Sequence, residues 1–61
     1  MERLLSARDV SEWTGLTVGH LAQLRYVGKG PRYIRLSSRR VAYRLKDVQA
    51  WLEACTVPTR M

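Results

Sequence analysis

The chain has 61 residues, of which 46% are apolar and 26% charged, and its net charge is +6. This length allows one small domain, and no apolar run approaches the roughly 18 residues of a membrane span. The single cysteine, Cys55, excludes an internal disulfide, and with one histidine, His20, it is too few for a zinc site, so we expect no metal or other cofactor. The N-terminus lacks the apolar stretch of a secretory signal, which predicts a cytoplasmic protein.

The charges are segregated along the chain. The interval from Trp13 to Lys46 contains no acidic residue, although it holds eight of the eleven basic residues. The five acidic residues lie on either side of it: Glu2, Asp9, Glu12, Asp47 and Glu53. Such segregation within one small domain is typical of a protein that binds a polyanion, most often nucleic acid, and the alternative is a basic face that only keeps the protein soluble.

Two short helices are predicted in the N-terminal half. The first spans about residues 7–14, because Ser6 and Asp9 form a capping-box pattern before it and Gly15 follows it. The second begins after Thr17, a good N-cap, and ends near Val27. Two short helices around a glycine turn form a helix-turn-helix.

A two-stranded hairpin is predicted next, because residues 28–31 break any helix and the residues after them alternate in polarity. Its turn is expected at residues 37–40. The residues expected to point inward, onto the helices, are Ile34, Leu36, Val41 and Tyr43. The residues expected to point outward are Tyr33, Arg35, Ala42 and Arg44.

A third helix is predicted over residues 45–55, although its N-cap is poorly specified. Its apolar stripe consists of Val48, Trp51, Leu52 and Cys55. The aromatic residues Trp13, Tyr43 and Trp51 are expected in the core. The expected fold is therefore mainly α with a small β-hairpin, a winged helix-turn-helix over residues 1–55, followed by a flexible tail over residues 56–61.

The same residues resemble the small excisionases of actinobacterial phages and integrative plasmids, which are also called recombination directionality factors. The resemblance is carried by LLSARDVSEWTGLT, LRYVGKGPRYIRL, RRVAYR and DVQAWLEA, which together span residues 4–54. The same module serves in AlpA-like transcriptional regulators and in MerR-type regulators. Members usually carry a glycine at the wing turn and an arginine in the return strand, where this chain has Ser37 and Ala42.

The resemblance implies a protein that binds repeated DNA sites near an attachment site, bends the DNA and directs an integrase toward excision. The implied partners are double-stranded DNA, an integrase and further copies of the chain on adjacent sites. We expect a monomer in free solution, in the cytoplasm of a prokaryotic host.

The second helix is expected in the major groove, since helix-turn-helix domains place the first residues of that helix against base edges. Its expected DNA contacts are Thr17, Val18, Gly19, His20 and Gln23. Gln23 suits adenine and Val18 a thymine methyl group, whereas Thr17 and the free amides after it suit a phosphate. His20 suits either a DNA acceptor or a local backbone group. With so few base readers, one copy should discriminate modestly between sequences.

The hairpin turn is the second expected contact. Ser38, Arg39 and Arg40 are expected to reach phosphates or the minor groove. Lys29 and Arg35 are expected to contact flanking phosphates, with solvated charge as the alternative for each.

The sequence also bears on three functions other than DNA recombination: an enzyme, a transcriptional regulator and a protein-binding adaptor. An enzyme is not expected, because the spacing of Asp9 and Glu12, the one close carboxylate pair, is explained by helix capping. Arg25, at the edge of the second helix, is expected to pair with one of these two acids instead of contacting a phosphate. The main alternative is a transcriptional regulator that acts without an integrase. A more distant one is an adaptor whose exposed Tyr26 and basic wing meet an acidic protein.

Overall fold

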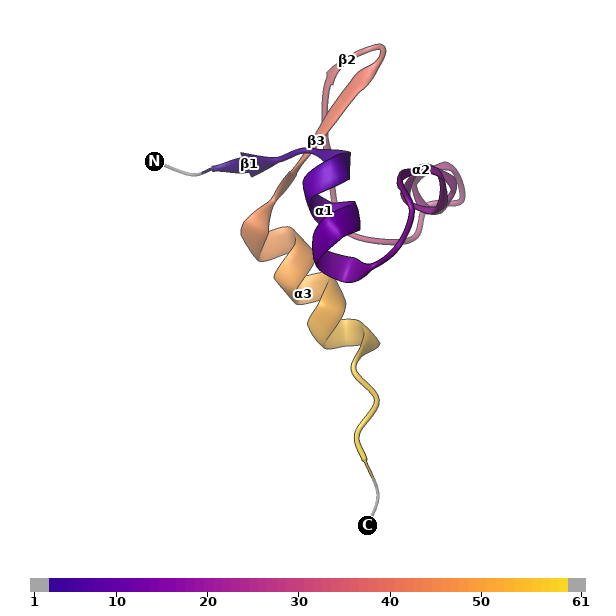
Figure 1. Cartoon of the computed structure of the whole chain (residues 1–61), viewed down its shortest axis with the longest axis vertical. Helices are drawn as coiled ribbons and strands as arrows, with labels where there is room; N and C mark the ends of the chain where they lie inside the picture. Colours follow the sequence, from indigo (N-terminus) through magenta and orange to yellow (C-terminus); the bar gives the residue numbers. More distant parts are fainter. Residues whose placement is uncertain (1–2, 60–61) are drawn as a thin grey trace.

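The computed structural model describes residues 3–59, which form three helices and a three-stranded antiparallel sheet (Figure 1). The elements in chain order are β1 (Leu4–Leu5), α1 (Ala7–Thr14), α2 (Val18–Tyr26), β2 (Ile34–Ser37), β3 (Arg40–Arg44) and α3 (Leu45–Cys55). The predicted winged helix-turn-helix is confirmed, with α1 and α2 as the helix-turn-helix and the β2–β3 hairpin as the wing. The sequence pattern does not predict β1, which pairs with β3 at the other edge of the sheet.

Both N-terminal helices begin where their capping residues predict. At α1 the Ser6 amide donates to Asp9 Oδ2 and the Asp9 amide donates to Ser6 Oγ, each over 3.0 Å, which is the expected capping box. At α2 the Thr17 hydroxyl accepts a hydrogen bond from the His20 amide over 3.0 Å. Gly15, with a φ of 82°, ends α1 and lets the chain turn directly toward α2.

The third helix follows β3 without a loop. Arg44 is its N-cap residue and makes no side-chain cap hydrogen bond. This agrees with the sequence, which offers no clear N-cap residue for this helix. Asp47 lies in the first turn, where the helix dipole favours a negative charge, and is 3.7 Å from the Arg44 guanidinium. Of the helices within residues 3–59, none has the length and apolar character needed to cross a bilayer.

The hairpin register differs from the one that simple alternation predicts. The paired residues are Ser37 with Arg40, Arg35 with Val41, and Ile34 with Ala42. The interval from Arg35 to Ser37 therefore contains one extra residue, Leu36, as a β-bulge. Because side chains alternate along a strand, this extra residue turns the rest of β2 over relative to β3. The predicted inward face is wrong for β2: Arg35 shares a face with Val41, and Ile34 shares the opposite face with Ala42.

Two individual burial predictions in the hairpin are also wrong. Leu36 is 54% exposed, because it is the bulged residue near the end of a hairpin that projects beyond the helices (Figure 1). Ala42 is buried although the alternation places it outward. Its partner across the strands, Ile34, is half-buried, so the face of the sheet that carries both residues is also partly covered.

The core consists of four fully buried side chains from α1, α2, β3 and α3: Val10, Leu21, Tyr43 and Val48. The core position of Tyr43 is confirmed, and Trp51 is half-buried. Trp13 is 44% exposed and Cys55 is exposed, so neither is the core residue that its helical spacing predicts. Both lie in the last turn of a short helix, beyond the core cluster. Residues 56–59 contain no helix or strand, and the last two residues of the predicted tail lie outside the described part.

Candidate nucleic-acid interface

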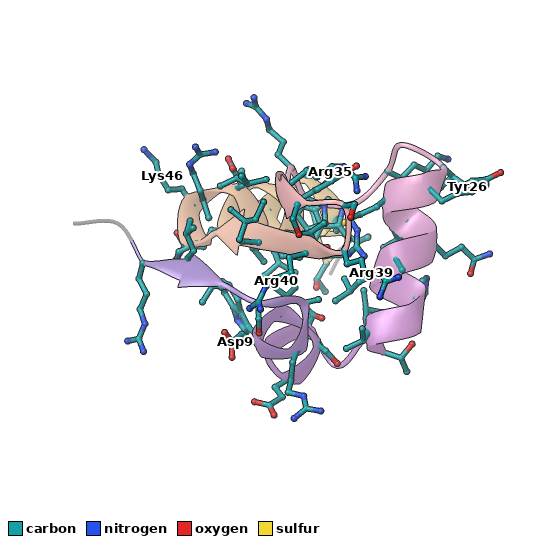
Figure 2. The ribbon with its side chains drawn as sticks, turned by 90° about the horizontal axis from the view of Figure 1, so that it is seen from above. Asp9, Tyr26, Arg35, Arg39, Arg40 and Lys46 are labelled. Atoms are coloured by element: carbon teal, nitrogen blue, oxygen red, sulfur yellow. The ribbon has the colours of Figure 1, made fainter. Side chains whose placement is uncertain are left out.

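The second helix presents the expected base-reading residues on an exposed surface. It lies to one side of the hairpin, and Leu21 is its buried residue (Figures 1 and 2). The five candidates are all exposed: Thr17, Val18, Gly19, His20 and Gln23. Thr17 uses its hydroxyl to cap the helix, so the first-turn amides that lack an intrahelical partner are the groups available to a phosphate.

The two wing arginines point to different sides of the hairpin. Figure 2 shows Arg39 between the wing and α2, whereas Arg40 extends toward α1 and lies near Asp9. The surfaces that they line agree with this view, since Arg39 lines a hollow with Ser38 and residues of α2, and Arg40 lines another with Leu4 and Asp9. The expected pair of wing arginines is therefore divided.

A groove of about 290 Å³ lies between α2 and the wing, and we call it the basic groove. Its lining residues are Ala22, Arg25 and Tyr26 from α2 and Arg35, Ser38, Arg39 and Val41 from the hairpin. Three of these seven residues are arginines and none is acidic. Tyr26 is 89% exposed at the end of α2, as expected. A concave surface of one charge sign concentrates the electrostatic field and attracts oppositely charged ligands.

Arg25 is the one of the three groove arginines that the sequence did not place among the DNA contacts. Its Nη1 donates a hydrogen bond to the Tyr43 hydroxyl over 2.6 Å, and its guanidinium carbon lies 5.7 Å from the centroid of the Tyr33 ring. The alternative pairing with Asp9 or Glu12 is therefore wrong. The physical reason is that Arg25 extends toward the wing, where two aromatic residues hold it, and away from α1.

The two residues expected to contact flanking phosphates occupy different places. The Arg35 guanidinium carbon lies 5.9 Å from the centroid of the Tyr33 ring, and the side chain lines the basic groove. The bulge at Leu36 puts Arg35 there, because it turns the β2 face with Arg35 toward α2. Lys29 is exposed in the loop after α2 and lines a separate hollow formed by residues 28–33.

Acidic side chains lie away from the basic groove. Asp9 is on α1, and its pKa is held below the ordinary value by the hydrogen bond from the Ser6 amide, with a further contribution from the Ser6 side chain. Asp9 therefore carries a negative charge at neutral pH. Within residues 3–59, no three His, Cys, Asp or Glu side chains gather in a way that suits a metal ion. The ligand that the groove favours is an anion.

The helix α2, which is expected to read base edges and which we call the reading helix, the wing and the basic groove between them define a winged helix-turn-helix protein of the DNA-binding class. Residues 3–56 match the family model described as prophage CP4-57 regulatory protein (AlpA). The chain belongs to this family of small phage DNA-binding regulators. No curated protein and no solved structure shows a significant match to the chain.

Proposed function

We propose that this protein is an excisionase, a recombination directionality factor that binds repeated sites near an attachment site, bends the DNA and directs an integrase toward excision. The observation that carries the proposal is the contrast between a groove with three arginines and a reading helix with few base-reading side chains. Contacts to the DNA backbone supply affinity, whereas contacts to base edges supply specificity. A protein with this balance works best as several copies on a deformed DNA.

The reading helix supports this balance. In α2, Gln23 suits a bidentate contact with adenine and Val18 suits a thymine methyl group. Gly19 and Ala22 offer a base no polar side-chain group, although their small size lets the helix come close to the DNA. One good bidentate contact discriminates between bases by about 1–3 kcal/mol. The remaining specificity would come from the shape and bending of the DNA and from repeated sites.

The proposal assigns the protein a binding role without catalysis or a cofactor. Its partners would be duplex DNA, an integrase and further copies of the same chain. The capping box supports the absence of acid–base chemistry at α1, since the Asp9 carboxylate already accepts the Ser6 amide hydrogen bond. The side of the wing away from α2 carries two exposed residues, Arg40 and Leu4. A second protein bound next to this one on DNA could contact them.

The test is recombination in vitro with an integrase encoded next to this protein and DNA carrying the attachment sites. Adding the protein should increase excision and decrease integration. The variant Arg39→Ala should lose this effect in proportion to its loss of DNA affinity, and Arg8→Ala, which removes an exposed arginine of α1, is the matched control. Unchanged excision at protein concentrations that saturate the DNA would contradict the proposal.

A second function, control of transcription without an integrase, is favoured by the regulatory role in the family description. In that case the protein would occupy a promoter and change the synthesis of one transcript. A promoter reporter in a strain without the integrase separates the two functions. A response that needs no integrase, together with unchanged excision, would support the regulator.

A further inference from the structure

We infer that the basic groove is a preassembled clamp for a phosphate of the DNA backbone, in which Arg25, held by Tyr43, binds the phosphate together with Arg35 and Arg39. The inference rests on the proposed DNA-binding function and specifies the group that is bound and the residues that bind it. It adds Arg25 as a ligand-binding residue and Tyr43 as a positioning residue.

The Arg25 side chain is anchored by contacts within the protein. Its Nη1 donates to the hydroxyl of Tyr43 over 2.6 Å, and the Tyr43 side chain is fully buried in the core. The Tyr33 ring lies 5.7 Å from the guanidinium carbon, within the range of a cation–π contact. A guanidinium carries five N–H donors, so the bond to Tyr43 leaves others for a ligand. An ordered side chain also loses less conformational entropy when it binds.

The charge of the groove calls for an anion. The Arg25 and Arg35 guanidinium carbons lie 5.7 and 5.9 Å from the centroid of the same Tyr33 ring, and Arg39 completes the lining. No carboxylate lines this groove, within the part of the chain that the structure describes. Like charges gathered in this way repel one another, and an anion between them relieves the repulsion. The fork of N–H donors on arginine matches the oxygens of a phosphate.

The position of the groove favours a backbone phosphate over free phosphate. The groove separates the reading helix from the wing (Figure 2). When α2 occupies the major groove and the wing reaches the adjacent minor groove, the DNA strand between the two grooves passes over this surface. One phosphate of that strand would then meet Arg25 and Arg39 from opposite walls.

The first experiment follows the Arg side-chain Nε–Hε signals of labelled protein by NMR during additions of dimethyl phosphate, a mimic of the backbone, and of inorganic phosphate. The Arg25 signal should shift with both, and sodium chloride at equal ionic strength should not reproduce the shift. The Arg8 signal is the control. In Tyr43→Phe the apparent affinity for phosphate should fall about tenfold, the loss expected when a hydrogen bond to a charged group is no longer positioned. An Arg25 signal that responds equally to chloride would overturn the inference.

The second experiment measures duplex DNA binding by Arg25→Lys, which keeps the positive charge and removes the fork. We expect about tenfold weaker binding than for the wild type, and unchanged binding for Arg8→Lys. Thermal unfolding of each variant separates loss of binding from loss of structure. If Arg25→Lys binds as tightly as the wild type, the clamp is wrong while DNA binding stands. If the wild type binds no duplex but inorganic phosphate still shifts the Arg25 signal, the DNA assignment is wrong and a free-phosphate site remains.

Discussion

Arg39 is the second residue of the two-residue hairpin turn, and Arg40 is the first residue of β3. Arg39, in the turn, lies beside α2, whereas Arg40, in the strand, extends toward α1 (Figure 2). Arg39 can therefore act together with Arg25 and Arg35 on one ligand. Arg40 lies at a different hollow, which Asp9 also lines. The Asp9 carboxylate is negatively charged at neutral pH.

The two wing arginines should consequently contribute unequally to DNA binding. Arg39→Ala is expected to weaken binding to a duplex of any sequence by about 1.5 kcal/mol, roughly tenfold, because a charge-assisted bond to phosphate is lost. Arg40→Ala is expected to weaken it less. Fluorescence anisotropy with random-sequence duplexes measures both, with Arg8→Ala as the control. Equal losses for Arg39→Ala and Arg40→Ala would contradict the division of the wing.

Gln23 should act on specificity more than on affinity. Gln23→Ala is expected to reduce the preference for the cognate site by about 1–3 kcal/mol, because a bidentate contact to adenine disappears. Binding to random DNA should change little, since that binding depends on phosphates. Parallel titrations with cognate and random duplexes give the ratio. An equal loss on both would show that Gln23 does not read a base.

At the scale of the elements, the hairpin owes its functional face to the bulge at Leu36. Without the extra residue, Arg35 would share the face of Ala42, away from Val41 and the basic groove.

The loop that connects α2 to the hairpin is also constrained, by a glycine that packs against α2. Gly30 has a φ of 83°, and a Cβ atom on it would lie 3.1 Å from Leu24 Cβ.

Gly15 and Gly30 provide a matched pair to measure this constraint. Their φ angles, 82° and 83°, are alike, but a Cβ on Gly15 meets nothing within 4 Å. Gly15→Ala is expected to cost about 1 kcal/mol of unfolding free energy, because the left-handed backbone disfavours a side chain. Gly30→Ala should cost about 1 kcal/mol more, through crowding against Leu24. Urea unfolding measures both, and equal costs would show that Leu24 moves aside freely.

The capping box of α1 predicts that the stability of the protein falls at low pH. The pKa of Asp9 in the folded protein lies below its ordinary value of 3.8. A carboxyl with a lowered folded pKa stabilises the protein fully above the unfolded pKa and loses this effect as the pH falls through the folded pKa. The difference in Tm between the wild type and Asp9→Ala should therefore be constant above pH 3.8 and shrink below it. A difference that persists at the lowest pH would contradict this account.

At the scale of the whole molecule, the positive charge is concentrated between α2 and the wing. The core residues join α1, α2, β3 and α3, and the acidic residues within 3–59 lie on α1 and α3. The basic groove lies between α2 and the wing, and no acidic residue lines it. The molecule therefore presents a cationic side to DNA, whereas its acids belong to other elements.

Binding to DNA should consequently weaken as the salt concentration rises. Each neutralised phosphate contributes about 0.9 to the slope of log affinity against log salt concentration, so the one phosphate held by the three groove arginines predicts a slope of about −0.9, and every further phosphate contact makes the slope steeper. Lys29 and the first-turn amides of α2 would add to the affinity. Titrations at several salt concentrations measure the slope for the wild type and for Arg39→Ala, which should be shallower. Equal slopes would remove Arg39 from the phosphate contacts.

Local patterns carry much of this fold. The capping residues Ser6 and Thr17 and the glycine at Gly15 predict both N-terminal helices to within a residue, because these signals act within one or two turns. The change from helical to alternating polarity predicts the hairpin, and the exposed reading residues of α2 follow from its helical period. The two-residue strand β1 has no such signal, since only its pairing with β3 defines it.

The sequence by itself determined the order of the three helices and the hairpin, the caps and the cationic middle of the chain, because each depends on residues close together in sequence. Only the tertiary structure decided which arginines act together. A bulge of one residue reverses Arg35, the start of β3 separates Arg40 from Arg39, and the packing of α2 beside the wing brings Arg25 to Tyr43. Arg25 lies four residues after the buried Leu21, which hints at an inward side, but its aromatic partners come from a distant strand and loop. Register and packing arise from contacts across the molecule, and no local pattern specifies them.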